Sequence, residues 1–577
     1  MRHLEAVRER VGTARLVLVA IVLVLAWSSW REHWLSALWL LVPVAGFICA
    51  VAYHAVLRRR HSRATRAAEF YRRGLARLED RWAGTGNAGE RFGDVHHVYA
   101  ADLDLFGEGS LFELLCAART RMGEETLARW LLAPAAIAEI RQRQTAVLDL
   151  RDRLDLRERI GTLGSEQDSA LDPRRFLTWA EAPGVLGAGW IRGAAYLLPA
   201  LLVASLIAGY LSGIWTPLLL VLIIEAAVLY RLRGRLDQTI FPAERAFDFD
   251  GLRTFAALLM EIERQQFDSP FMRSLADEIS SGGIRASARI GQLATVVMVS
   301  EQRMNPLVSG LKVPLMLMLH VALAAERWRR AHGKSVRGWV EAVGRFESIS
   351  SLAQYSFERP GDPFPRLIEG RAYLRAGGIG HPLIPSSHCV RNDVNLADRT
   401  RVWLVSGSNM SGKSTLLRAV GLNVVLAMSG APVRAQVLEL TPLQVGASIR
   451  INDSLREGSS RFYAEITRLR QLKDLSEQEP PLLFLIDEML QGTNSKDRRI
   501  GAEGVLGALV EQGAIGLATT HDLALTELGG LGDGVLRNLH FEDSLENGRM
   551  SFDYELREGV VMKSNGLELM RAIGLRV

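Results

Sequence analysis

Two long runs of uncharged residues near the N-terminus dominate the hydrophobic pattern of the chain. Leu16–Trp30 contains 15 residues without a charged side chain, and Trp34–Leu57 contains 24 residues without Asp, Glu, Lys or Arg. Because a helix needs about 20 apolar residues to cross a bilayer, the second run is long enough and the first is short. Arginines flank both outer ends, which predicts a transmembrane hairpin over residues 1–63 with both ends in the cytoplasm. A cleaved signal peptide is the alternative for the first run.

A second apolar block lies further along the chain. Gly193–Ile224 holds 32 residues without a charge, and Glu225 then interrupts the apolar pattern. Glycines around Gly213 mark a turn, so the pattern predicts a second transmembrane hairpin over residues 186–235, again with cytoplasmic ends. One long tilted span and a buried hairpin of a soluble protein are the alternatives. A single span would put its two flanks on opposite sides of the membrane.

The pattern between and after these blocks is helical. Apolar residues recur at helical spacing through 64–185 and 236–360, which predicts an all-α core and lever in two parts. The apolar run Val313–Ala325 has only 13 residues and suits a buried core helix better than a membrane span. Prolines and a glycine in Pro360–Pro365 predict a linker. Strand patterns follow, so residues 366–577 form a separate C-terminal domain.

Composition agrees with membrane segments beside globular parts, because 48% of the residues are hydrophobic while 23% are charged. The net charge of +5 permits anionic partners without identifying one. Cys49, Cys116 and Cys389 lie far apart and show no metal-ligand spacing, which predicts neither a disulfide framework nor a metal site and fits a reducing compartment.

The C-terminal domain carries a phosphate-binding pattern. An apolar strand, Val402–Val405, leads into a loop with the spacing G-x-x-x-x-G-K-[ST] and then into a helical pattern. Glycines let backbone N–H groups turn towards phosphates, and the helix N-terminus adds partial positive charge. Lys413 can reach the β- and γ-phosphates, and Ser414 can ligate Mg²⁺. The predicted nucleotide-binding residues of the loop are Gly407, Ser408, Asn409, Met410, Ser411, Gly412, Lys413, Ser414 and Thr415. A glycine-rich turn that matches by chance is the alternative.

Two more apolar strands end in polar residues that fit this chemistry. The run 481–486 precedes Asp487 and Glu488, and the run 514–518 precedes a turn that contains His521. We predict that Asp487 shares Mg²⁺ with Ser414, that Glu488 polarises the attacking water, and that His521 senses the γ-phosphate. A solvated helix cap and a packed turn residue are the respective alternatives for Glu488 and His521.

A Gly-Ser-Ser turn at 458–460 precedes another helical pattern and forms a second candidate anion site. In head-to-tail ATPase dimers such a turn caps the γ-phosphate bound by the other subunit, which gives Ser460 a role in a homodimer. An ordinary helix N-cap is the alternative.

Taken together, these motifs resemble those of the MutS mismatch-repair ATPases. Asn409-Met410 inside the loop and Gly492-Thr493 after the two carboxylates are particular to that family among ABC-type ATPases, whereas transporter subunits carry an LSGGQ-like turn. Further stretches resemble the start of the MutS core and the family's C-terminal ending: Leu111–Leu115, Arg121–Gly123, Leu127–Pro134 and Gly559–Leu567.

The resemblance implies an α/β P-loop ATPase domain of ABC type behind an all-α region, with ATP and Mg²⁺ as cofactors. It implies catalytic roles for Glu488 and His521 and a γ-phosphate contact for Asn409. The family stacks adenine between a phenylalanine and a later aromatic residue. Those positions fall here at Cys389 and near Tyr554, so one of the two aromatic residues is replaced.

Two departures from the family shape the predicted function. Residues 64–100 are too few for the family's mismatch-recognition and connector domains, and the second hairpin stands where the family inserts its DNA clamp. We therefore predict a MutS-like, mismatch-repair-related ATPase anchored in the cytoplasmic membrane by several spans. Its ATPase domain faces the cytoplasm, and ATP drives a conformational switch in a homodimer. A membrane ATPase switch without a DNA ligand and an ABC transporter-like ATPase are the alternatives.

DNA is a possible partner, and one arginine-rich stretch is the candidate contact with its phosphates. Acidic residues interrupt this stretch, so a solvated helix face is the alternative. Its basic residues are Arg141, Arg143, Arg151, Arg153, Arg157 and Arg159.

Overall fold

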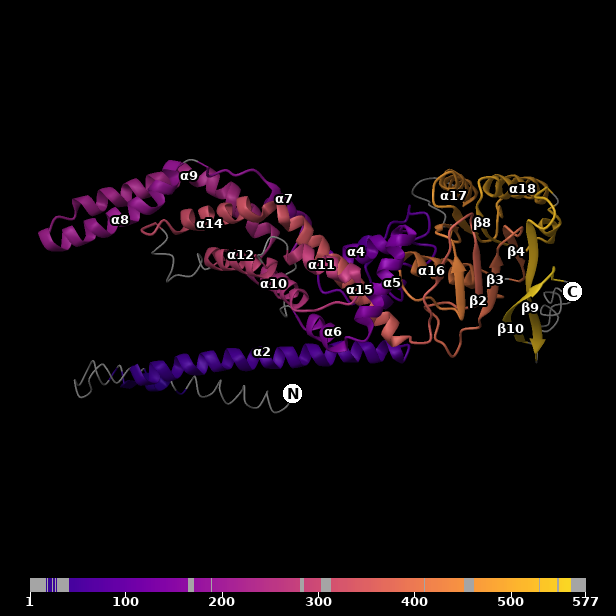
Figure 1. Cartoon of the computed structure of the whole chain (residues 1–577), viewed down its shortest axis with the longest axis horizontal. Helices are drawn as coiled ribbons and strands as arrows, with labels where there is room; N and C mark the ends of the chain where they lie inside the picture. The colour runs from indigo at the N-terminus through magenta and orange to yellow at the C-terminus, as the bar shows by residue number, and fades with distance from the viewer. Residues whose placement is uncertain are drawn as a thin grey trace.

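The molecule is elongated, with an α/β domain at one end and two helical arms at the other (Figure 1). A body of packed helices lies between them. The structure is a computed structural model that describes residues 17, 19–22, 24–25, 27, 41–163, 171–187, 189–280, 285–301, 313–408, 410–450, 461–528, 530–546 and 549–561.

The first arm is the helix α2, Leu41–Leu78. About half of the predicted first span, 16–30, lies outside the described residues. The helix continues unbroken past residue 63, where the predicted hairpin ends, because arginine favours helix and Arg58–Arg63 therefore marks no helix end. Its apolar portion stops at Leu57.

The second arm is a helical hairpin of α8, Gly189–Ser212, and α9, Thr216–Ala246. Gly213 takes a positive φ of 75° at the turn, where the glycine pattern predicts one. Helix α9 runs past residue 235, where the predicted hairpin ends. By length and hydropathy, α8 is the helix among the described residues that can cross a membrane, and only 11% of its most apolar 18-residue window is buried. The predicted pairs of spans are therefore not shown.

The helical body is organised around the long helix α15, Val336–Glu358, which packs against α4, α5 and α11. Gly344 allows a close approach to α4, because a Cβ there would lie 2.6 Å from Oγ1 of Thr126. The apolar run 313–325 contributes to α14, whose Leu319 and Ala322 are buried against the bases of α8 and α9, as expected for a core helix. The other helices of the body are α3 Leu111–Leu115, α4 Arg121–Leu132, α5 Ile137–Arg151, α6 Leu154–Gly161, α7 Pro173–Glu181, α10 Phe249–Glu263, α11 Pro270–Ser280, α12 Ala286–Glu301 and α14 Leu317–His332, with short 3₁₀ turns at η2 Glu90–Phe92 and η5 Gly333–Ser335.

The arginine-rich stretch is used inside this body, so the hypothesis that it contacts DNA phosphates is wrong for its buried members. Arg143 is 3% exposed, and its guanidinium lies 3.9 Å from the ring centre of Trp130. Arg157 is 2% exposed and donates to the side chain of Gln354. The remaining members of the stretch also donate hydrogen bonds to acceptors within the protein. They are Arg141, Arg151, Arg153 and Arg159.

Helix α15 also carries a buried carboxylate, Glu347, which is 1% exposed. It accepts hydrogen bonds from the backbone N–H of Arg119 at 2.9 Å and from the hydroxyl of Thr120, the N-cap of α4. Burial raises the pKa of Glu347 from its ordinary value of 4.5 to about 7, and the two hydrogen bonds oppose part of that shift.

This shift predicts a pH-dependent stability. Because the folded-state pKa is the higher one, the contribution of Glu347 is fully present below pH 4.5 and is lost as pH rises through 7. A shift of this size corresponds to about 3 kcal/mol. We expect Glu347→Gln to flatten the change of thermal unfolding temperature between pH 4.5 and 7.5. Glu341→Gln, an exposed position on the same helix, should leave the profile unchanged, and equal profiles for all three proteins would contradict the prediction.

The described part of the C-terminal domain contains two sheets, and its α/β class confirms the prediction for this part of the chain. The larger sheet has the order β10-β9-β4-β8-β7-β6, in which all neighbouring strands are parallel except β10 and β9. Its strands are β4 Val402–Ser406, β6 Gln444–Ser448, β7 Leu482–Ile486, β8 Ile515–Thr520, β9 Leu536–Glu546 and β10 Arg549–Glu558. The smaller sheet has the order β1-β5-β2-β3, with β1 Arg366–Leu367, β2 Leu374–Ile379, β3 Asn392–Leu396 and β5 Val437–Leu440.

In the described residues of the domain there are also three helices, α16 Lys413–Ser429, α17 Arg461–Ser476 and α18 Ser495–Glu511, and the 3₁₀ turn η6 Leu523–Glu527. Strands β4, β7 and β8 are buried at every position, as their continuous apolar runs predict for a parallel sheet covered on both faces. Their register pairs Ser406 with Thr520 and Ile486 with Ala518. The carboxyl ends of the three strands therefore meet at one edge of the sheet.

Candidate nucleotide-binding site

The loop between β4 and α16 requires glycine at two positions. Gly407 has a φ of 153°, and a Cβ there would lie 2.8 Å from Oγ of Ser411. Gly412 has a φ of 102° and is the N-cap of α16, and a Cβ there would lie 3.1 Å from the ring of Tyr554. Asn409 lies outside the described residues. The loop conformation thus accounts for both glycines of the predicted phosphate-binding pattern.

Lys413 begins α16 and turns its side chain back over the loop. Its Nζ donates to the carbonyl oxygens of Gly407 at 2.9 Å and Ser408 at 2.7 Å. Burial lowers the pKa of Lys413, and the charges of Glu488 and Asp487 oppose that shift in part. The ammonium therefore lies inside the loop, where phosphate oxygens could take the place of the two carbonyls.

Two hydroxyl groups of the loop also suit an anionic ligand. Oγ of Ser408 and Oγ of Ser411 are buried and have no hydrogen-bond partner among the described residues. An unpaired buried hydroxyl is costly unless a ligand or water completes it. Together with the start of α16, these groups fit the phosphates of a nucleotide.

Asp487 follows the end of β7 and contacts both α16 and β8. Its Oδ2 accepts a hydrogen bond from Oγ of Ser414 at 2.5 Å, and its Oδ1 accepts one from the hydroxyl of Thr519 on β8. The structure thus brings together the two predicted Mg²⁺ ligands, which lie far apart in sequence. A hydroxyl and a carboxylate oxygen fit the ligand preference of Mg²⁺.

Glu488 and His521 lie beside this pair. His521 Nδ1 is 3.8 Å from Oε1 of Glu488, and the amide of Gln491 donates to the Glu488 carboxylate and lies 3.4 Å from His521 Nδ1. The backbone N–H of Glu488 donates to Oγ1 of Thr519 at 2.9 Å. Gln491 was not predicted, because no spacing pattern distinguishes it from other loop residues.

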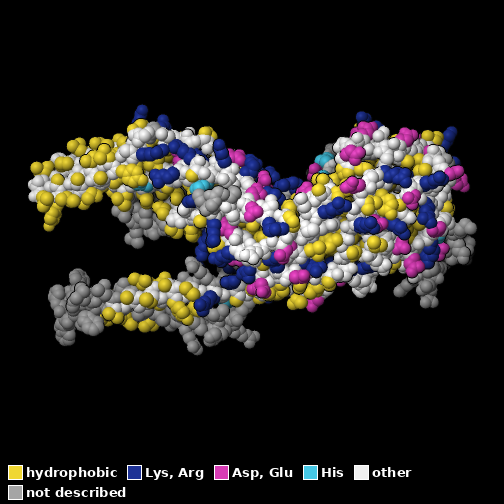
Figure 2. Space-filling view, viewed as in Figure 1, with side chains coloured by type: hydrophobic (Ala, Val, Ile, Leu, Met, Phe, Trp, Pro, Cys, Tyr) yellow, Lys and Arg dark blue, Asp and Glu magenta, His cyan; other side chains and the backbone are white. Residues whose placement is uncertain are grey.

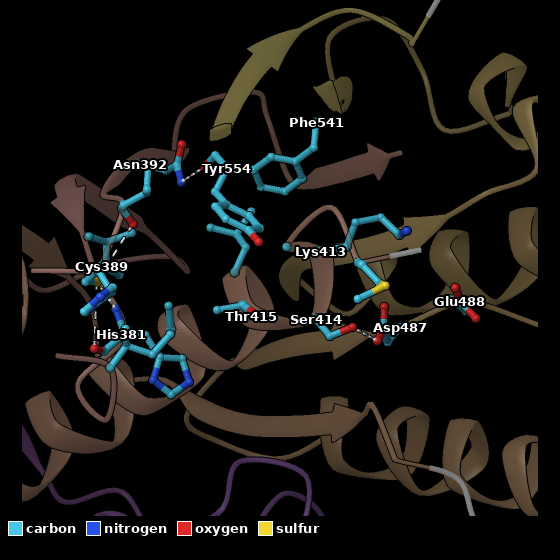
Figure 3. Close-up of a pocket in the computed structure, with 18 residues that line it drawn as sticks. His381, Cys389, Asn392, Lys413, Ser414, Thr415, Asp487, Glu488, Phe541 and Tyr554 are labelled. Carbon is cyan, nitrogen blue, oxygen red and sulfur yellow. Dashed lines mark hydrogen bonds between the residues drawn. The ribbon is translucent and has the colours of Figure 1, made fainter. Parts of the chain in front are cut away.

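Lys413, Ser414, Asp487 and Glu488 line one side of a cavity of about 790 Å³ (Figure 3), whereas His521 and Gln491 are not among the residues that line it. Met410 and Thr415 also line it. The volume lies in the range of small-molecule sites, and the cavity wall combines the loop with an apolar end. Residues of that far end include Ile379, His381, Ile384, Cys389, Phe541 and Tyr554.

The far end contains both residues predicted for the adenine side, Cys389 and Tyr554, together with Phe541 and His381, which sequence reasoning missed. A register shift in β10 between Phe552 and Leu556 allows Tyr554, at a positive φ of 58°, to face the cavity. Burial lowers the pKa of His381 to about 4, so its imidazole is neutral at neutral pH. Phe541, Tyr554 and the neutral His381 thus give this end of the cavity an aromatic surface, which suits a nucleobase.

Ser460 lies outside the described residues, as does the whole stretch 451–460. The residues just before it are held by the helical body, because Oδ1 of Asp102 accepts hydrogen bonds from the backbone N–H groups of Ile449 at 2.8 Å and Arg450 at 2.7 Å. The role of Ser460 towards a partner subunit stays a prediction.

The strand–loop–helix geometry and the polar groups at the strand ends define a P-loop nucleotide-binding domain. Within that class, residues 403–576 match the family model for MutS domain V. The C-terminal region of the chain therefore carries a MutS-type domain V, and the resemblance found in the motifs is confirmed for this region.

Curated relatives agree with this assignment. The chain is 34% identical over 255 residues to the "Endonuclease MutS2" of Thermus thermophilus, covering 43% of this chain and 32% of the relative. It is 31% identical over 242 residues to the "DNA mismatch repair protein MutS 2" of Halobacterium salinarum, with 41% and 28% covered. It is 34% identical over 259 residues to the "DNA mismatch repair protein MutS" of Thermus thermophilus, with 44% and 30% covered. The chain spans about a third or less of the length of each of these three relatives.

Proposed function

We propose that this protein is a MutS-type ATPase that hydrolyses ATP with Mg²⁺ and works as a homodimer. The observation that carries the proposal is the convergence of Lys413, Ser414, Asp487 and Glu488 on one wall of the cavity. Phosphoryl transfer of this kind depends on positioning and electrostatic stabilisation, and these residues supply both.

Each group has a task that its position supports. Lys413 and the N–H groups at the start of α16 bind the phosphates. Ser414 and Asp487 hold Mg²⁺, which neutralises phosphate charge when it is bound. Glu488 orients a water molecule and accepts its proton, Gln491 keeps the carboxylate in place, and His521 senses the γ-phosphate.

The link between ATP and the rest of the molecule runs through the segment 97–104 of the helical body. The carbonyl of Val98 accepts a hydrogen bond from the N–H of Ala447 on β6 at 2.8 Å. Arg418 on α16 donates to the carbonyl of Asp102 at 2.9 Å, and Arg450 pairs with Asp104. A movement of α16 or β6 on ATP binding would therefore be passed to the helices, which supports an ATP-driven conformational switch.

The output end of that switch is a membrane attachment at the cytoplasmic face. Hydrophobic side chains cover the far end of the α8–α9 hairpin, and basic side chains gather near its base (Figure 2). Soluble proteins rarely expose so large a continuous apolar surface. Exposed apolar residues of the hairpin include Leu197, Leu201, Val203, Leu206, Ile207, Tyr210, Leu211, Leu219, Leu220, Ile223 and Ile224.

The attachment predicts that the protein sediments with membranes and needs detergent, not high salt, for release. Val203→Arg combined with Leu206→Arg should shift it towards the soluble fraction, because an arginine at the centre of a span costs roughly 2.5–3.5 kcal/mol. Both side chains are about half exposed, so the variant should fold. Leu148→Arg, at an exposed apolar position of α5, is the matched control. A wild-type chain that stays soluble without detergent would remove the attachment.

DNA binding is the second candidate function, and the names of the relatives favour it. Hydrolysis by the purified protein, measured with and without matched and mismatched duplexes, tests it. Stimulation by DNA with an affinity that falls steeply with salt would support a DNA ligand. An unchanged rate with every duplex would favour the ATPase switch without DNA.

A further inference from the structure

One arginine that the proposed mechanism does not use connects the two loops that carry Glu488 and His521. Arg498 lies in the first turn of α18, and its side chain is only 14% exposed. Its Nε donates to the carbonyl of Leu490 at 3.0 Å, and its Nη1 donates to Oδ2 of Asp522 at 3.0 Å. Nη2 donates to the carbonyls of Gln491 at 3.3 Å and Thr493 at 3.0 Å. One guanidinium thus contacts three carbonyls of the loop after β7 and one carboxylate of the loop after β8.

The loop after β7 needs such a contact because its backbone is strained. Glu488 has a φ of 50° and Leu490 has a φ of 56°, both in the left-handed region that residues other than glycine rarely adopt. Conformations of this kind persist where the surroundings fix them in several ways. The N–H of Leu490 donates to Glu465 on α17, and Arg498 holds the carbonyl of the same residue.

We propose that Arg498 is a positioning residue that fixes the Glu488 carboxylate and the His521 ring relative to each other. The proposal rests on the proposed function and adds to it a residue outside the phosphate-binding and carboxylate motifs. Arginine is required because its planar fork presents five N–H donors in fixed directions, whereas the lysine ammonium is a single point.

The start of α18 does not itself depend on this side chain. Asn494 caps the helix, and its Oδ1 accepts a hydrogen bond from the N–H of Asp497 at 3.0 Å. The side chain of the neighbouring Arg499 donates to the carbonyl of Glu527 at 3.3 Å. Arg499 therefore offers a matched control on the same helical turn.

The kinetic test compares Arg498→Gln, Arg498→Lys and Arg499→Gln in the full-length protein purified in detergent. We expect Arg498→Gln to lower kcat between about 10-fold and 100-fold, since a misplacement of about 1 Å costs that much. The Kd for a fluorescent ATP analogue with Mg²⁺ should stay within about twofold. Arg498→Lys should lower kcat less, and Arg499→Gln should match the wild type. Wild-type kcat in Arg498→Gln, or a Kd that rises in proportion as kcat falls, would overturn the proposal.

A second measurement separates this inference from the proposed function. Hydrogen exchange of the peptide 487–493 should be about tenfold faster in Arg498→Gln than in Arg499→Gln, whether or not the protein hydrolyses ATP. If the wild-type protein shows no ATPase activity and Arg498→Gln still exchanges faster than Arg499→Gln, the positioning role stands and the proposed function fails. Unchanged exchange would overturn the positioning role. If Arg498→Gln unfolds at a lower temperature than the wild type, the test rests on Arg498→Lys instead. Hydrogen exchange and kcat equal to those of the wild type in Arg498→Lys would then overturn the proposal.

Discussion

Lys413→Ala is expected to lower kcat/KM for ATP hydrolysis by about 10³-fold or more, which is at or above the upper end of the loss found when one preorganised donor is removed from a site. Lys413 Nζ is the cation enclosed by the phosphate-binding loop, where the side chain is only 5% exposed. Its charge would stabilise the β- and γ-phosphates most strongly as bonds to the γ-phosphate break. Phosphate release by detergent-purified protein with Mg²⁺ and ATP is the measurement.

The control must separate lost chemistry from lost structure, because Lys413 Nζ also donates to two carbonyls of its own loop. Lys413→Met retains most of the side-chain volume and should show the same loss. Lys473→Ala removes an exposed lysine of α17 that pairs with Glu477, and it should hydrolyse ATP at the wild-type rate. If Lys413→Ala and Lys413→Met unfold at the wild-type temperature and still hydrolyse ATP normally, the site assignment fails.

The sequence predicted those parts of the site that depend on local pattern and on sheet edges. The phosphate-binding loop is a contiguous strand–loop–helix, so its glycines and Lys413 could be read directly. Ser414 and Asp487 are distant in sequence, but each follows a buried parallel strand, β4 and β7 respectively. Since the carboxyl ends of such strands share one edge, their meeting followed from the order of elements.

The parts that escaped prediction depend on tertiary packing without a sequence period. Phe541 reaches the cavity from β9, and His381 reaches it from the turn after β2, and neither residue belongs to a motif. The positive φ angles of Glu488 and Leu490 give no compositional signal, because neither residue is glycine. Arg498 is one of many arginines in the sequence, and only its four acceptors distinguish it.

The two helical arms give another example of structure that the sequence pattern did not determine. Charge marked where a membrane boundary would lie, but it did not mark where a helix ends, so α2 continues to Leu78 and α9 to Ala246. In the arginine-rich stretch, composition suggested an anionic ligand, whereas the fold uses Arg143 against an aromatic ring. Charge in a sequence gives the number of cations, and packing decides how many of them face solvent.

Glu488→Gln is expected to lower turnover strongly while leaving nucleotide binding intact. The amide keeps the size of the side chain, and the backbone N–H of Glu488 still donates to Thr519. The side-chain amide cannot accept the proton of the attacking water. We therefore expect kcat to fall by about 10²–10⁴-fold, the range typical of a lost general base. The Kd for an ATP analogue with Mg²⁺ should change by less than about twofold.

Because ATP would then persist in the site, this variant also tests the homodimer. With ATP, light scattering should detect a larger dimer fraction for Glu488→Gln than for the wild type. With ADP, the dimer fractions of the two proteins should be equal. Glu511→Gln, an exposed carboxylate at the end of α18, is the control and should behave as the wild type. Loss of ATP binding in parallel with turnover would make Glu488 a binding group instead of the base. Lys413→Ala and Glu488→Gln thus separate the two steps, because the first should fail at holding the phosphates and the second only at cleaving them.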